Sequence, residues 1–171
     1  MKHDKYEMSA EVYQSIKRGE NKYKVKSDYQ LVIGIDPDVE KNGIAIYAPF
    51  DKSLQLYNWY FFELYDNLKT YKQVTDEKIL LVIEAGYLNK SNWHVHSKQK
   101  KSLVANIGQR TGANHQVAIM LAQMAEYLEI DYKLVKPTKS KMNSDTFKKI
   151  TGYKKLSNQE QRDAAILVWG Y

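Results

Sequence analysis

Three apolar stretches of the sequence adjoin carboxylates, and this pattern constrains the fold more than any other feature. Asp36 ends the run LVIGID, and Glu84 ends the run ILLVIE. Glu160 and Asp163 come directly before the run AAILVW. A carboxylate beside a core is costly unless a cation pairs with it. We therefore expect the fold to gather these acids around one divalent-metal site.

Length and composition favour a single domain that binds a polyanion. The 171 residues are enough for a substantial core, and the 26 Lys and Arg against 20 Asp and Glu give a net charge of +6. The absence of Cys excludes disulfides and thiolate zinc sites. Since we find neither a membrane-spanning run nor a secretory signal, we expect a cytoplasmic protein with no membrane partner.

The chain divides into a polar extension at residues 1–28 and a domain at 29–171. In the extension, Met8, Val12 and Ile16 recur at helical spacing, which predicts a short amphipathic helix ended by Gly19. In the domain, β-branched and aromatic runs alternate with helical patterns. The strands are predicted at 29–35, 43–48, 54–64, 80–85 and 132–135, and the helices at 66–76, 103–128, within 139–153 and at 159–171.

This order of elements predicts an α/β fold with a five-stranded mixed sheet flanked by helices. Gly108 and Gly112 interrupt the helical pattern of 103–128, at a cost of about 1 kcal/mol each inside a helix. We take that cost to mean that something approaches the backbone closely at these two glycines.

Four carboxylates would meet if the strands that end in Asp36 and Glu84 are neighbours. Glu160 and Asp163 are three residues apart and therefore share one helix face. Such a cluster repels itself without cations, and all-oxygen ligands suit Mg²⁺, with Mn²⁺ as a substitute. Two such ions about 4 Å apart would stabilise the attacking water and the leaving oxygen of a phosphodiester.

Five segments, in order, resemble the motifs of RuvC-type Holliday-junction resolvases. The resemblance covers residues from about 31 to 171, and no single segment is highly specific. The segments are GIDPD at 34–38 with Gly43 after it, VIEAGY at 82–87, IGQRTGA at 107–113, KPTKSK at 136–141 and EQRDAA at 160–165.

The resemblance implies an RNase H-like nuclease domain at 29–171, a homodimer, and Mg²⁺-dependent paired cleavage of a four-way DNA junction in recombination and repair. Carried over, it makes Asp36, Glu84, Glu160 and Asp163 the metal ligands. It places Lys141 near the scissile phosphate, where its charge would help catalysis. It also makes Tyr87 the aromatic residue that stacks on an unpaired base at the junction centre.

Basic residues beside these motifs are expected to contact DNA phosphates. They are Lys90, Lys98, Lys100, Lys101, Arg110 and Lys139. His94 and His96 alternate within the same basic segment, but no third zinc ligand is evident, so we interpret them as solvated.

The chain departs from the family at two acids. Asp38 stands where the family usually has glycine after Asp-Pro, which leaves open whether Asp38 joins the metal site. Glu160 stands where Asp is more usual and would reach further. Residues 1–28 have no counterpart in the family.

Three other functions compete with junction resolution. One is an RNase H-like nuclease that acts on RNA–DNA hybrids or flaps, and another is a non-catalytic junction-binding protein. The third is an actin-like ATPase or sugar kinase, a class that is usually much larger and needs a second phosphate loop. We find no such loop in the sequence.

Overall fold

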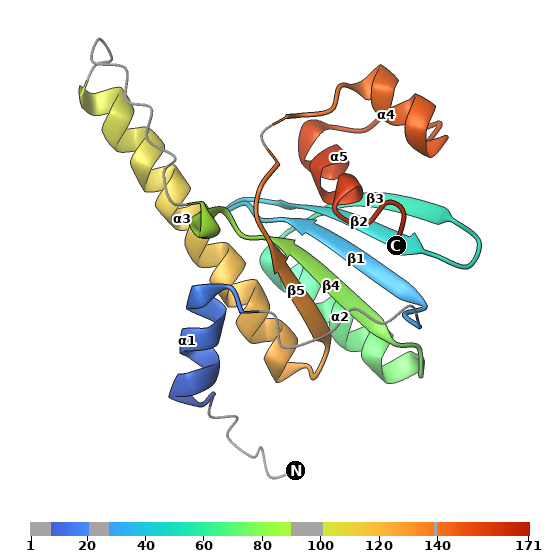
Figure 1. Ribbon diagram of the computed structural model, residues 1–171, viewed down its shortest axis with the longest axis horizontal. Helices are drawn as coiled ribbons and strands as arrows, with labels where there is room; N and C mark the ends of the chain where they lie inside the picture. Colours follow the sequence, from blue (N-terminus) through green and yellow to red (C-terminus); the bar gives the residue numbers. More distant parts are fainter. Residues whose placement is uncertain (1–7, 21–27, 90–100, 139) are drawn as a thin grey trace.

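The strands form one mixed sheet in the order β3-β2-β1-β4-β5 (Figure 1). In this computed structural model, the described residues are 8–20, 28–89, 101–138 and 140–171, with the side chains of 101–107 outside the description. β1 pairs antiparallel with β2 and parallel with β4, so the predicted mixed sheet is confirmed. The strands are β1 (Leu31–Asp36), β2 (Asn42–Ala48), β3 (Ser53–Trp59), β4 (Ile79–Glu84) and β5 (Asp131–Val135).

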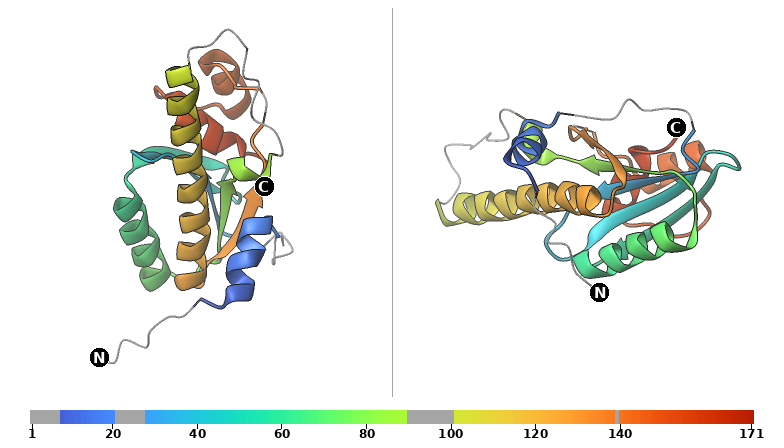
Figure 2. Two further views of the ribbon diagram at one scale, coloured as in Figure 1. Left: turned by 90° about the vertical axis from the view of Figure 1, so that its left-hand side faces the viewer. Right: turned by 90° about the horizontal axis from the view of Figure 1, so that it is seen from below.

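Helices cover both faces of the sheet (Figure 2). Alternate residues of β1 show the division, since Ile33 and Ile35 are buried in the cluster shared with α2 and α3, whereas Val32 is buried in the cluster shared with α5. The helices are α1 (Ala10–Arg18), α2 (Phe61–Val74), the 3₁₀ turn η1 (Gly86–Leu88), α3 (Lys101–Tyr127), α4 (Ser144–Thr151) and α5 (Gln159–Ile166).

The predicted helix in the N-terminal extension is present as α1. Gly19 ends it in the left-handed conformation, at φ 68°, as the pattern indicated. Ile16 is fully buried in the same cluster as the sheet and α3. A Cβ on Gly19 would lie 2.3 Å from a methyl group of Leu88, so α1 packs tightly on η1.

The prediction of a strand at 54–64 followed by a helix at 66–76 was wrong at the boundary. β3 ends at Trp59 and α2 begins at Phe61. The backbone N–H of Tyr60 donates to Glu63 Oε2 at 3.0 Å, which starts the helix earlier than the aromatic run indicated. Leu64 and Leu68, four residues apart, are then fully buried by the helix.

α3 is one continuous helix of 27 residues that extends beyond the sheet (Figure 1). Gly108 and Gly112 both lie inside it, so the helix predicted at 103–128 is confirmed and runs through both glycines. A Cβ on Gly112 would meet nothing within 4 Å in the described chain. The close approach to the backbone expected at Gly112 is therefore not made by the described part of the protein.

Candidate active site

Asp36 and Glu84 end adjacent parallel strands at the same level. Ile35 of β1 is in register with Ile83 of β4, so the next residue of each strand is one of the two acids. Because parallel strands run in one direction, both carboxylates lie at the same edge of the sheet. The expected neighbour relation of the two acids is therefore present in the structure.

Two glycines allow α5 to lie directly on one face of the sheet, beside these strand ends. A Cβ on Gly34 would be 2.1 Å from the carbonyl oxygen of Ala164, and a Cβ on Gly43 would be 2.3 Å from that of Glu160. Neither distance is tolerable against a backbone atom, so only glycine permits this packing. The glycines of the first motif therefore set how close the α5 acids come to Asp36.

A cavity of about 290 Å³ lies at this end of the sheet. It brings together the predicted residues Asp36, Glu84, Glu160 and Lys141, while Asp163 joins the group through its contact with Lys141. The full lining is Asp36, Pro37, Asp38, Glu84, Gly86, Thr111, Asn114, His115, Lys141 and Glu160.

The two strand-end acids resist ionisation. Burial, with repulsion from Glu84 and Asp163, raises the pKa of Asp36 to about 7 against an attraction to Lys141. Burial, with repulsion from Asp163, also raises the pKa of Glu84. The nearby negative charge therefore exceeds what Lys141 compensates, and a bound cation would favour the ionised forms.

Asp163 already has a cationic partner. Lys141 Nζ donates to Asp163 Oδ2 at 2.7 Å, and Gln159 Nε2 donates to Asp163 Oδ1 at 2.6 Å. The hydrogen bond from Lys141 to Asp163, together with attraction to Asp163, Asp36 and Glu84, raises the pKa of Lys141. The Lys141 side chain is 68% exposed and that of Asp163 only 14%, so the ammonium stays within reach of a ligand from solvent.

Arg162 fixes the segment that carries Lys141. Its Nε donates to the carbonyl oxygen of Met142 at 3.0 Å, and its NH1 donates to that of Ser157 at 2.5 Å. Its NH2 donates to Gln159 Oε1 at 2.8 Å. This hydrogen bond orients the Gln159 amide, whose Nε2 donates to Asp163. One guanidinium thus connects the loop before α4 with the start of α5.

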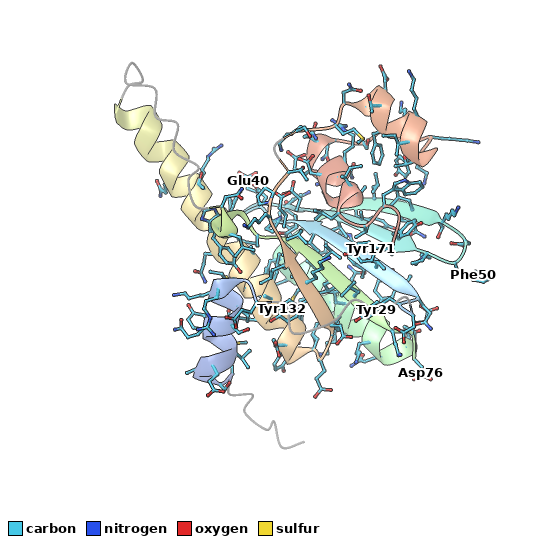
Figure 3. The ribbon with its side chains drawn as sticks, in the orientation of Figure 1. Tyr29, Glu40, Phe50, Asp76, Tyr132 and Tyr171 are labelled. Atoms are coloured by element: carbon cyan, nitrogen blue, oxygen red, sulfur yellow. The ribbon has the colours of Figure 1, made fainter. Side chains whose placement is uncertain are left out.

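Asp38 holds the β1–β2 loop against α3 (Figure 3 labels Glu40 in this loop). Its Oδ1 accepts from the backbone N–H of Glu40 at 2.8 Å, and its Oδ2 accepts from Asn114 Nδ2 at 3.2 Å. Asn114 Oδ1 accepts in turn from the backbone N–H of Val39 at 3.2 Å. Asp38 lines the cavity, but both of its oxygens already have partners.

The donor set suits a hard cation, although the side chains do not converge on one point. Carboxylate oxygens are the ligands that Mg²⁺ and Mn²⁺ prefer. Among the described residues, no three His, Cys, Asp or Glu side chains are placed as ligands of one metal ion. The types of residue therefore fit an Mg²⁺ site, whereas binding would require the side chains to turn toward the ion.

Tyr87 has a role in packing that the sequence did not indicate. Its hydroxyl donates to the backbone carbonyl of Ile16 at 2.7 Å, and its ring packs against the core cluster and lies edge-on to His115. Burial raises the pKa of Tyr87 to about 12. Tyr87 thus attaches α1 to the turn that follows Glu84, and stacking on a base stays an untested prediction for a half-buried ring.

The predicted DNA-contacting residues are only partly described. Arg110 is exposed on α3 and lines a second cavity beside the first. Lys90, Lys98, Lys100 and Lys139 lie outside the described residues, as do His94, His96 and the side chain of Lys101.

Sequence reasoning missed three polar residues of the site, namely Asn114, His115 and Gln159. The first two directly follow the glycine-containing motif at 107–113. Gln159 is four residues before Asp163, a spacing that places these two side chains on one helix face. Burial lowers the pKa of His115. Only the i,i+4 spacing of Gln159 offered a signal in the sequence.

Comparison with protein-family models, with curated proteins and with solved structures finds no match to this chain. Among the helices that the structure describes, none has the length and apolar character to cross a membrane.

Proposed function

We propose that this chain is a metal-dependent endonuclease of the RuvC type, with an RNase H-like fold, that resolves four-way DNA junctions in the cytoplasm. One observation carries the proposal. The acids that end two adjacent parallel strands line a single cavity with Glu160 of α5 and Lys141, and Lys141 in turn pairs with Asp163 of the same helix. The five-stranded mixed sheet flanked by helices is the architecture that the resemblance implies.

The metal ligands would be Asp36, Glu84, Glu160 and Asp163. Bound Mg²⁺ would neutralise the developing charge on a phosphodiester and lower the pKa of an attacking water. The exposed ammonium of Lys141 can hold a phosphate oxygen at the cavity, because it is already oriented by Asp163. Gln159 and Arg162 keep that ion pair in place.

The test is a cleavage assay on a four-way junction, a flap, an RNA–DNA hybrid and a plain duplex, with and without Mg²⁺. We expect Mg²⁺-dependent paired cuts in the junction. Asp36→Asn should abolish cleavage and retain junction binding, while Asp66→Asn, at an exposed position on α2, should cut normally. Normal cleavage by Asp36→Asn would refute the assignment of the site.

Two alternatives remain within the same fold, and the substrate panel separates them from junction resolution. Preferential cutting of hybrids or flaps would indicate another RNase H-like nuclease. Binding of junctions without any cleavage would indicate a non-catalytic junction-binding protein. The homodimer that the resemblance implies would be checked by the mass of the protein in solution.

A further inference from the structure

A groove larger than the acid cavity lies directly beside it. Its volume is about 840 Å³, within the range of ligand-binding pockets. Asp38, Asn114 and Glu160 line both spaces and so form their common wall. The residues that line only the groove are Val39, Glu40, Lys41, Asn58, Tyr60, Arg110 and Asn158.

The groove presents an aromatic ring whose position is supported by its neighbours. Tyr60 is 56% exposed, and Lys41 Nζ lies 4.5 Å from the centre of its ring. The backbone N–H of Tyr60 is fixed by Glu63 at the start of α2. Lys41 is attracted to one face of the ring, and a ring that is 56% exposed still has surface on which a flat ligand can stack.

Amide groups lie along the same groove. Asn158 Nδ2 donates to Asn58 Oδ1 at 2.8 Å, which joins the start of α5 to β3. The Asn158 side chain also accepts from the backbone N–H of Gln161 at 2.9 Å. Asn58 is held in place while its amide nitrogen can still donate to the edge of a base.

The charge balance of the groove argues against a double helix as its ligand. Its two cations, Lys41 and Arg110, face three carboxylates, those of Asp38, Glu40 and Glu160. Proteins bind duplex DNA largely by neutralising phosphates, which this balance does not support. Single strands are held by stacking of bases on aromatic rings together with basic side chains that contact phosphates, and the groove offers Tyr60 for the first contact and Lys41 and Arg110 for the second.

We infer that this groove binds an unpaired DNA strand next to the acid cavity, with one base stacked on Tyr60. The inference rests on the proposed nuclease function and names the part of the substrate that the site selects. Arg110 would contact a phosphate of the same strand, and Asn58 would contact the stacked base or its neighbour.

The test measures the fluorescence of a single-stranded DNA with one 2-aminopurine, titrated with the full chain without metal. Stacking should quench the probe with the parent and with Tyr60→Phe. Tyr60→Ala should lose the quench and bind about ten-fold more weakly. Phe62→Ala is the matched control, since Phe62 is 77% exposed in the first turn of α2, just after Tyr60, and does not line the groove.

The inference is overturned if Tyr60→Ala quenches and binds like the parent, or if the parent does not quench. Circular dichroism of Tyr60→Ala should match the parent, because the N–H bond to Glu63 uses only backbone of Tyr60. Failure of the nuclease proposal looks different. In that case the parent would quench the 2-aminopurine probe and Tyr60→Ala would not, but the parent would cut none of the four substrates. If the parent cuts the junction and Tyr60→Ala binds and quenches like the parent, the groove proposal alone is refuted.

Discussion

The two pairs of acids in the site differ in how the fold has prepared them. Asp36 and Glu84 are half-buried at strand ends, and their pKa values are raised mainly by burial. Asp163 has an ammonium and an amide as partners, and Glu160 is exposed. The strands therefore supply charges that need a cation, whereas α5 supplies one acid that is already compensated and one that water can solvate.

The largest expected effect is on the cleavage rate, which should depend much more on Asp36 and Glu84 than on the exposed Glu160. Asp36→Asn and Glu84→Gln should each reduce junction cleavage by at least about 10³-fold, because each removes charge from the enclosed part of the site. Glu160→Gln should cost less, on the order of 10-fold, since this side chain is exposed. Single-turnover cleavage rates at saturating Mg²⁺ measure the difference, and equal losses at all three positions would erase the distinction.

Lys141→Gln should affect cleavage far more than stability. Cleavage should fall by about 10²-fold, because the variant loses the positive charge at the cavity. Because the ammonium of its ion pair with Asp163 is 68% exposed and solvent screens the charge, the pair contributes about 1 kcal/mol to folding and the unfolding transition should move little. Lys133→Gln is the control, since Lys133 is on β5 and does not line the cavity. A large loss of stability with intact cleavage would contradict the assigned role.

A single added methyl group at Gly34 or Gly43 should disrupt the packing of α5 on the sheet. Gly34→Ala or Gly43→Ala should destabilise the protein by about 3 kcal/mol, since the new methyl group would meet a backbone carbonyl of α5. Gly112→Ala is the matched control in open space and should stabilise α3 by up to about 1 kcal/mol. Urea unfolding measures all three, and a neutral Gly34→Ala would show that α5 does not pack this closely.

The raised pKa of Asp36, about 7, gives a stability–pH prediction for the metal-free protein. Between pH 4 and 7 the native state holds a proton on Asp36 that the unfolded chain releases, so stability falls as the pH rises through this window. Asp36→Asn should flatten the slope and be more stable than the parent at pH 8 by on the order of 2 kcal/mol.

Thermal unfolding in EDTA from pH 4 to 8 measures this effect, with Asp66→Asn as the control. Mg²⁺ at pH 8 should raise the melting temperature of the parent but not of Asp36→Asn, because only the parent keeps the full set of carboxylates. A parent whose stability rises with pH would contradict the buried, proton-holding Asp36.

Much of this site could be predicted locally, because a strand that ends in an acid is visible as an apolar run. The α1 helix with its Gly19 cap was predicted for the same reason, since helical spacing and a terminal glycine are short-range signals. The boundary between β3 and α2 was missed, because the run of aromatic residues near Tyr60 suits either structure.

The sequence by itself determined the residue types of the site and the elements that carry them, since apolar periodicity and motif order are properties of neighbouring residues. Only the tertiary structure decided which distant groups meet: Lys141 with Asp163, Asn114 with Asp38, and Tyr87 with Ile16. These contacts join residues between 22 and 76 positions apart. No local pattern specifies them, because they depend on how closely α5, α3 and α1 pack on the same end of the sheet.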